Sequence, residues 1–203
     1  KLRFPGFTEP WKTVRLGDVV TKVARRNRGV SSRVLTASGQ YGLIDQREFF
    51  SRRVASAKID EYYLLRRGEF AYNRSSMQGY NFGAIKRLDR YEDAAISTLY
   101  VCFAITDQNV DSDFLAQMFD SRVLDRQLRT VVRIGIRDHG LLNLDIGDFF
   151  AMSIRLPSQR EQRRIAECLS AADCEIQLLK QQRAAFAAQR RGLMEKLLSG
   201  EID

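Results

Sequence analysis

The last fifth of this 203-residue sequence carries a seven-residue repeat of apolar side chains, which limits the possible folds more than any other feature. The spacing alternates between four and three residues over nearly five heptads. This pattern is typical of a coiled coil rather than of a helix that lies on a globular core. Two arginines interrupt it. The two interleaved sets of the predicted seam are Ile165, Ala172, Leu179, Phe186 and Leu193, and Leu169, Ile176, Arg183, Arg190 and Leu197.

Start and stop signals indicate that this stretch is one helix. Ser158 is followed three residues later by Glu161, which predicts a capping box in which each side chain accepts a hydrogen bond from the other residue's backbone N–H. Gly200 is a typical stop signal. At about 1.5 Å per residue, the helix would be about 60 Å long, more than the width of a small domain. We therefore predict that it pairs with another helix; packing against its own domain is the alternative.

The length and composition leave room for one domain before this helix. With 44% hydrophobic residues the chain can bury a core, so we assign residues 1–157 to a globular domain and 158–203 to the helix. The sequence has no apolar run of about 18 residues and no secretion leader, which predicts a cytoplasmic protein. Three cysteines without paired spacing and a single histidine predict free thiols and no metal site.

The net charge of +8 is concentrated before the helix. Only 8 of the 33 basic residues and 7 of the 25 acidic residues follow Pro157, so the first domain carries nearly all of the excess. A basic domain favours a polyanionic partner, because each phosphate that Lys or Arg neutralises releases a condensed counterion. Many basic proteins bind no nucleic acid, so the charge alone leaves this question open.

Residues 1–157 have the sequence pattern of a mixed α/β domain. Residues 1–11 are punctuated by prolines and are expected to lie over the domain surface, while 16–22 form a helical turn or a short strand. A helix that packs on the core is expected from residue 111 or 112 to about 128, and a closing strand over 148–156. Short runs of β-branched and aromatic residues predict a twisted mixed sheet. These runs are residues 34–36, 41–44, 62–65, 70–72, 83–88 and 97–105.

Three polar segments of this domain, together with Arg133, contain the candidate DNA-binding residues. Residues 72–81 are rich in side chains that bond base edges, since Arg pairs with guanine and Asn or Gln with adenine, while Tyr stacks or reaches phosphate. The basic loop 25–28 is expected to contact phosphates, and 134–143 form a glycine-flanked loop with the single histidine. The alternatives are a polar hairpin, a solvated loop and a structural histidine, all without a ligand. The candidate residues are Arg25, Arg26, Arg28, Arg74, Ser75, Gln78, Tyr80, Arg133, Arg137 and His139.

The sequence contains none of the common catalytic motifs. We find no phosphate-binding glycine loop, no dinucleotide fingerprint and no Ser, His, Asp arrangement in a recognisable context. Arginines 122, 126, 129, 133 and 137 would share a face only if the predicted helix continued past residue 128. We therefore expect no catalytic residue and no cofactor in this chain.

Several short motifs, taken in order, resemble the DNA-specificity subunit of type I restriction-modification systems. They cover nearly the whole chain, and their order is more specific than any single piece. The motifs are LRFPGF with Trp11, LGDVV, YGLIDQREFF, RRGEFAYNRS, GAIKRL, STLYVCF, RDHGLLN, DFF, LPSQREQRRIA and KLLSG.

This resemblance implies an α/β target recognition domain that reads one half of a split DNA sequence, followed by a long helix that serves as spacer and docking surface. It also implies a subunit without catalytic activity of its own. The implied partners are modification subunits, which bind S-adenosylmethionine and methylate adenine, and restriction subunits, which use ATP and Mg²⁺ to translocate and cut DNA. The usual subunit has two domains and two helices, so this chain is expected to be half of one, either natural or cut from a longer chain.

Pairing of two copies would rebuild the missing half. Because the domain precedes the helix, an antiparallel pair places the two domains at opposite ends and predicts an inverted-repeat target. Arg183 then falls near Glu175 of the other chain, and Arg190 near Glu167. Polar residues outside the seam are hypothesised to dock modification subunits, with simple solvation as the alternative. They are Gln159, Gln162, Arg163, Gln177, Gln181 and Gln189.

Two other classes of function remain open. A free-standing dimeric DNA-binding regulator would share the charge and the coiled coil without needing a methyltransferase. An enzyme with its own nuclease or methyltransferase chemistry is disfavoured, because the (Asn/Asp)-Pro-Pro-(Tyr/Phe) methyltransferase motif is absent from the sequence.

Overall fold

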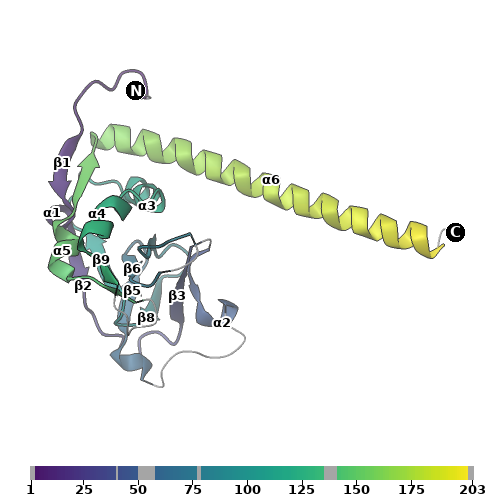
Figure 1. Cartoon of the computed structure of the whole chain (residues 1–203), viewed down its shortest axis with the longest axis horizontal. Helices are drawn as coiled ribbons and strands as arrows, with labels where there is room; N and C mark the ends of the chain where they lie inside the picture. Colours follow the sequence, from purple (N-terminus) through teal and green to yellow (C-terminus); the bar gives the residue numbers. More distant parts are fainter. Residues whose placement is uncertain (1–2, 40, 50–57, 77–78, 135–140, 201–203) are drawn as a thin grey trace. The chain divides into compact units, whose positions relative to one another are not determined.

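The computed structural model describes residues 3–39, 41–49, 58–76, 79–134 and 141–200 (Figure 1). The chain divides into two compact units, residues 1–163 and 164–203. The first unit contains all the strands and the short helices, and the second contains most of one long helix. Among the described residues, no helix combines the length and the hydrophobicity that crossing a bilayer requires.

Two four-stranded sheets form the body of the first unit. The first sheet has the order β2-β9-β6-β7, and all its neighbours are antiparallel. The second has the order β4-β3-β8-β5, with a parallel β3–β8 pair between antiparallel neighbours. The strands of the first sheet are β2 (Val20–Val23), β9 (Val101–Ile105), β6 (Phe70–Asn73) and β7 (Ala84–Arg87). Those of the second are β4 (Gly42–Asp45), β3 (Val34–Ser38), β8 (Asp93–Ile96) and β5 (Tyr63–Arg66).

The predicted α/β class is confirmed, although the strands divide between two sheets rather than forming one. Strand β8 was not predicted, because Ile96 is the only aromatic or β-branched residue in its sequence DAAI. The remaining short elements are β1 (Lys12–Arg15), α1 (Leu16–Val19), α2 (Gln46–Phe49), the 3-10 helix η1 (Ile59–Glu61), β10 (Arg133–Ile134) and β11 (Leu142–Asn143).

A hydrophobic core lies between the two sheets. Because side chains alternate along a strand, β6 and β9 present the small residues Ala71 and Cys102 on this side. Leu35 and Ile96 of the second sheet belong to the same buried cluster. Burial raises the pKa of the Cys102 thiol to about 12. This cysteine therefore stays protonated near neutral pH and packs as a small apolar side chain.

The other face of the first sheet carries a cluster of aromatic rings. Phe70 and Phe103 stack with ring centroids 5.4 Å apart, and Phe119 of α3 (Ser112–Asp120) meets Phe70 edge-on at 5.6 Å. Tyr72 stacks on Phe149 of α5 (Ile146–Ala151) at 4.9 Å. Buried aromatic pairs of this kind contribute packing beyond their area. The first sheet is therefore the middle layer of the unit, with helices on one face and the second sheet on the other.

The predicted helix over 111–128 is wrong in its second half. Asp111 caps α3 by accepting hydrogen bonds from the backbone N–H groups of Asp113 and Phe114. The helix then ends at Asp120, and a second helix, α4 (Asp125–Val131), follows. Arg122 lies between them with a φ of 59°, outside the helical region. The arginines after residue 120 therefore do not lie on one continuous helix.

The predicted closing strand is also too long. Residues 153–156 form strand β12 (Ser153–Leu156), whereas the preceding residues form α5. Asp145 caps the N-terminus of α5, because its carboxylate accepts hydrogen bonds from the backbone N–H groups of Gly147 and Asp148. This cap favours the helical turn over the extension of β12 toward its N-terminus.

The amino-terminal segment lies over the first unit, as predicted, and it contacts the start of the long helix α6 (Gln159–Ser199). The guanidinium of Arg3 donates to both carboxylate oxygens of Glu161, from Nε at 2.7 Å and from Nη2 at 2.6 Å. The indole of Trp11 donates to Glu161 Oε1 at 3.4 Å and meets Phe114 edge-on. Glu161, which was expected to cap the helix, therefore binds the amino-terminal segment.

This pair makes the stability of the first unit depend on pH. The hydrogen bond from Arg3 lowers the pKa of the buried Glu161 carboxyl. A lowered folded-state pKa contributes stability above the ordinary glutamate pKa of about 4.3, and this is lost as the pH falls through the lowered value. In urea unfolding between pH 7 and pH 3, we therefore expect Glu161→Gln to lose less stability than the parent. Glu167→Gln, at an exposed site, should behave as the parent; equal losses in all three proteins would contradict the assignment.

Helix α6 has 41 residues, about 60 Å at 1.5 Å per residue, and begins one residue after its predicted start. The predicted long C-terminal helix is confirmed. Within the single chain, most apolar seam residues are exposed to solvent: Leu169, Ile176, Leu179, Phe186, Leu193 and Leu197 have exposed fractions between 43% and 61%. Pairing through this seam stays a prediction.

The hypothesised docking strip is wrong for Gln162, which is only 1% exposed. Its side-chain Oε1 accepts from Asp111 N at 2.8 Å, and its Nε2 donates to the carbonyls of Asn109 and Pro157 at 3.0 Å each. Gln159 likewise donates to a backbone carbonyl of the first unit, at Gln108. These amides hold the start of α6 to the body of the unit. Gln177, Gln181 and Gln189 are exposed.

Candidate nucleic-acid interface

The predicted reading loop, residues 72–81, comprises the end of β6 and most of the segment that leads to β7, and β10–β11 is joined to its first half. The carbonyl of Arg74 accepts a hydrogen bond from Leu142 N at 2.7 Å, and Ser75 forms an antiparallel bridge with Leu141. Ser75 N also donates to the side chain of Asn73 at 3.1 Å. The structure therefore brings together two of the three segments in which the sequence predicted DNA-binding residues.

Part of the predicted site lies outside the described residues. Strands β10 and β11 are antiparallel partners, with Arg133 opposite Asn143. Gln78, Arg137 and His139 lie outside the described residues. Their roles stay predictions from sequence.

The Arg74 side chain is half-buried at the base of the reading loop. Its Nε donates to the carbonyl of Leu99 at 3.1 Å, in the turn between β8 and β9. Among the described residues, its two terminal nitrogens bond to no other group. A guanidinium fixed at Nε and free at its terminal nitrogens can donate to the acceptors of a guanine edge.

Tyr80 is engaged inside the protein. Its hydroxyl donates to the carbonyl of Gly39 at 2.9 Å, and its ring lies so close that a Cβ at Gly39 would be 2.3 Å from a ring carbon. The ammonium of Lys86 lies 5.3 Å from the centre of the same ring. These contacts fasten the second half of the reading loop to the neighbouring β3–β4 connection. We therefore assign Tyr80 to holding the loop rather than to stacking on a base.

The three arginines of the basic loop have different surroundings. Arg25 is half-buried and donates to Glu69 at 3.1 Å and 3.3 Å, which neutralises its charge. Arg26 donates to the carbonyl of Glu61 and lies over the ring of Tyr63. Arg28 is exposed, and among the described residues its side chain has no partner. Of the three, Arg28 is the best placed to contact a phosphate.

Helix α4 carries two basic residues that were not among the predicted contacts. Arg126 and Arg129 are exposed and three residues apart, so they lie on neighbouring positions of one helix face. In the described part of the chain, neither is paired with a carboxylate. The four-residue spacing of buried Leu124 and Leu128 could have indicated an outward face here. This face was not predicted, because residues 111 or 112 to about 128 were expected to form one continuous helix.

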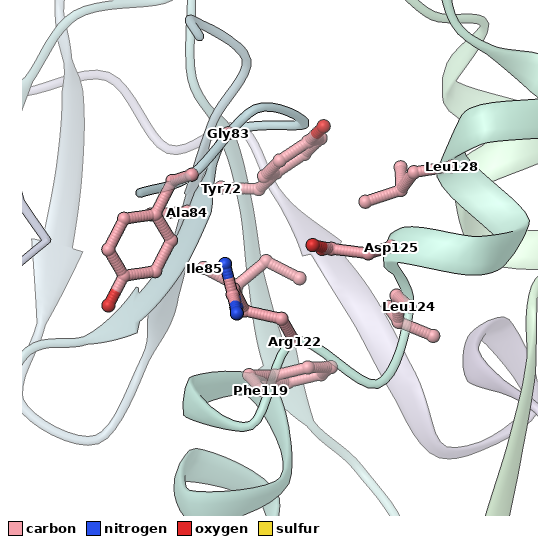
Figure 2. A pocket seen from close by; sticks show the side chains of 10 residues that line it. Tyr72, Gly83, Ala84, Ile85, Phe119, Arg122, Leu124, Asp125 and Leu128 are labelled. Carbon is pink, nitrogen blue, oxygen red and sulfur yellow. The ribbon is translucent and has the colours of Figure 1, made fainter. Parts of the chain in front are cut away.

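A small pocket separates β6 and β7 from α3 and α4 (Figure 2). Figure 2 shows Arg122 and Asp125 reaching into it from the helical side, toward Tyr72 and Ile85. Its volume of about 10 Å³ holds at most one water molecule. Burial raises the pKa of the Asp125 carboxyl. The pocket is too small for a nucleobase or a cofactor, and it also contains no group of metal-binding side chains among the described residues.

A sequence model of the type I restriction modification DNA specificity domain matches residues 8–186. The chain belongs to this family. The resemblance inferred from the ordered motifs is therefore confirmed. A comparison with curated proteins gives no match.

The fold of this specificity domain is similar to three solved structures. The first comes from a study of complex assembly and conformational transition in the type I R-M system, with a TM-score of 0.63, 18% identity, and coverage of 97% of this chain and 50% of that chain. For the HsdS subunit from Thermoanaerobacter tengcongensis, the TM-score is 0.58 and the identity 18%, and the match covers 88% of this chain and 46% of that chain. For the S subunit from M. genitalium, the TM-score is 0.51 and the identity 14%, and the match covers 87% of this chain and 42% of that chain. The specificity domain thus spans half or less of the length of each.

Contacts in this specificity domain join the first motif of the series that indicated the family to the motif at the start of α6. Arg3 and Trp11 belong to the first motif, and Glu161 belongs to the motif at the start of α6. The hydrogen bonds between them join parts of the chain that are about 150 residues apart in the sequence. They stabilise the unit and lie in segments separate from the reading loop.

Proposed function

We propose that this specificity domain reads one half of a split DNA target and has no catalytic activity of its own. The observation that carries the proposal is the reading loop, whose first half is joined to β10–β11 and whose second half is bonded to Gly39 and to Arg122. Arg122 lies in the turn before α4, whose Arg126 and Arg129 are unpaired among the described residues. Such an arrangement suits a rigid platform for base edges flanked by charges for phosphates. The net charge of +8 supports a polyanionic partner.

The proposed contacts divide into base readers and phosphate binders. Arg74 and Ser75 are assigned to base edges, because they lie in the reading loop at its junction with β10–β11. Arg28, Arg126 and Arg129 are assigned to phosphates, because they are exposed and uncompensated among the described residues. Phosphate contacts fix position and carry no sequence information, whereas base contacts do.

The two classes should respond differently to alanine. We expect Arg74→Ala to cost about 1 to 3 kcal/mol on target DNA and little on random DNA. Changing Arg126 and Arg129 together to alanine should weaken binding to target DNA and to random DNA alike. It should also reduce the slope of log affinity against log salt concentration by about two. Fluorescence anisotropy over a salt series measures both effects. Undiminished discrimination by Arg74→Ala would show that this loop is not the reader.

We infer that this chain binds the modification and restriction subunits of its own restriction-modification system. S-adenosylmethionine, ATP and Mg²⁺ would then belong to those subunits and not to this chain. The test is to mix the chain with its modification subunit and to map the methylated sequence. Failure to direct methylation to any defined sequence would reject the proposed function.

Two copies are proposed to pair through α6 in antiparallel orientation. The support is the row of apolar side chains along the helix, which the single chain leaves exposed. A twofold pair would present two identical reading surfaces, and the methylated target should then be an inverted repeat. The exposed residues of the predicted docking strip lie outside the seam and remain candidates for contact with a modification subunit: Arg163, Gln177, Gln181 and Gln189.

A further inference from the structure

Arg122 has an unusual backbone conformation for an arginine. Its φ of 59° lies in the left-handed region, which side chains with a Cβ rarely adopt. It directly follows Ser121, the C-cap of α3, at the position where helices most often have glycine. Hydrogen bonds from Arg122 N to Phe119 O and from Asp125 N to Arg122 O fix the turn. A side chain retained in a strained position points to a function for that side chain.

The guanidinium of Arg122 bonds to the reading loop. Its Nη1 donates to the carbonyl of Gly79 at 2.7 Å, across 43 residues of sequence. In Figure 2 the side chain extends from the turn after Phe119 toward Ile85 of β7, the strand that follows the loop. Because it joins a backbone carbonyl of the loop, this bond does not depend on the loop's own side chains.

A second contact from the end of α3 holds the next residue of the loop. Asp120 forms an ion pair with Lys86 at 2.6 Å, and Lys86 is only 9% exposed. The same ammonium lies 3.5 Å from the hydroxyl of Tyr80. Gly79 and Tyr80 are therefore both held from the turn that leads into α4.

We propose that Arg122 is a positioning residue that couples α4 to the reading loop. This inference rests on the proposed function. Phosphate contact by Arg126 and Arg129 fixes α4 on the DNA, and the bond from Arg122 to Gly79 transmits that placement to the loop that contains Arg74. Arg122 touches no base in this scheme. Its effect is on discrimination between sequences and not on affinity for DNA in general.

Arg122→Gly is the main test, since glycine accepts the left-handed backbone while the guanidinium is lost. We expect this variant to melt no lower than the parent. Its ratio of affinities for the mapped target duplex and a duplex with a scrambled half-site should fall about tenfold, comparable to one lost base contact. Affinity for the scrambled duplex should stay at the parent level. Arg129→Ala is the matched control, and it should weaken both duplexes and keep the ratio.

Amide hydrogen exchange gives a readout that does not depend on DNA. The segment 79–83 should exchange faster in Arg122→Gly than in the parent, with β6 unchanged. Arg122→Asn, whose side chain also tolerates the left-handed region, is the second variant if the first does not fold.

An unchanged affinity ratio together with unchanged exchange would overturn the proposal. An equal loss on both duplexes would make Arg122 a phosphate contact, which also overturns it. If the parent itself fails to discriminate, the proposed function fails, and the exchange comparison still decides whether Arg122 holds the loop.

Discussion

Replacing Gln162 by alanine is expected to lower the free energy of unfolding of the first unit by about 3 kcal/mol. The side chain is buried and joins three backbone groups, the N–H of Asp111 and the carbonyls of Asn109 and Pro157. Alanine would leave all three without this partner, and each unsatisfied buried group costs about 1 to 3 kcal/mol. Entry of water into the vacated space offsets part of the sum.

Urea unfolding followed by the fluorescence of Trp11, the only tryptophan, measures this effect in the unit concerned. Gln177→Ala is the matched control, because it removes the same side chain from an exposed site on the same helix. We expect it to change stability by less than about 0.5 kcal/mol. If the two variants are equally stable, the start of α6 is not held by Gln162.

Changing Leu169, Ile176 and Leu179 together to aspartate is expected to convert a dimer of the chain into a monomer. All three are seam residues, exposed by 43%, 47% and 53% in the single chain. Two chains paired through the seam would bury six carboxylates without partners, and the penalty is several kcal/mol for each buried ion. Light scattering at one protein concentration distinguishes the two masses. A monomeric parent, or a dimeric variant, removes the pairing proposal.

The control for this change introduces the same charges outside the seam. Aspartates at 174, 181 and 188 lie on the face of α6 opposite the repeat and should leave the mass at that of the dimer. A dimer lost in both variants would mean that added charge, rather than the seam, controls the mass.

The orientation of the pair can be tested with disulfides, after Cys168 and Cys174 are changed to alanine. In a fully overlapped antiparallel pair, residue 172 lies level with residue 186 of the other chain. Residue 172 of the other chain is then about 21 Å away along the helix axis. Ala172→Cys and Phe186→Cys should therefore form disulfides when mixed, and neither should do so alone, since a disulfide needs Cβ atoms about 4 Å apart. A disulfide in Ala172→Cys alone would indicate a parallel pair.

The long helix could be predicted closely because its signal is repeated many times. A period sustained over about 40 residues leaves little ambiguity, and the predicted start at Ser158 is one residue from the observed one. The six predicted strands lie within a few residues of observed strands, because a local run of β-branched and aromatic residues marks each of them. Their division into two sheets could not be predicted, because the pairing of β3 with β8 joins residues 61 positions apart and no local pattern encodes it.

The candidate site shows the same limit at the level of side chains. Composition predicted that residues 72–81 are a reading loop, and the structure joins this segment to β10–β11; the reading role stays a prediction. The engagement of Tyr80 by Gly39 and of Arg25 by Glu69 could not be predicted, because these partners are 41 and 44 residues away. Arg126 and Arg129 were not among the predicted contacts for a different reason: the helix expected from residue 111 or 112 to about 128 breaks at Arg122, so α4 was not foreseen as a separate helix.

Strands β1 and β12 are antiparallel neighbours, with Arg15 opposite Ser153, so the chain enters and leaves the body of the first unit at one place (Figure 1). The residues between these two strands include the reading loop and both large sheets, whereas the contacts of Arg3 and Trp11 with Glu161 lie outside them. A gene segment bounded by the codons of β1 and β12 could therefore be exchanged for another if the incoming segment also supplied backbone partners for Gln159 and Gln162, because Gln108, Asn109 and Asp111 lie between the two strands. If this segment reads DNA as proposed, recombination at these two strands would change the DNA sequence that is read and keep the exposed seam of the long helix.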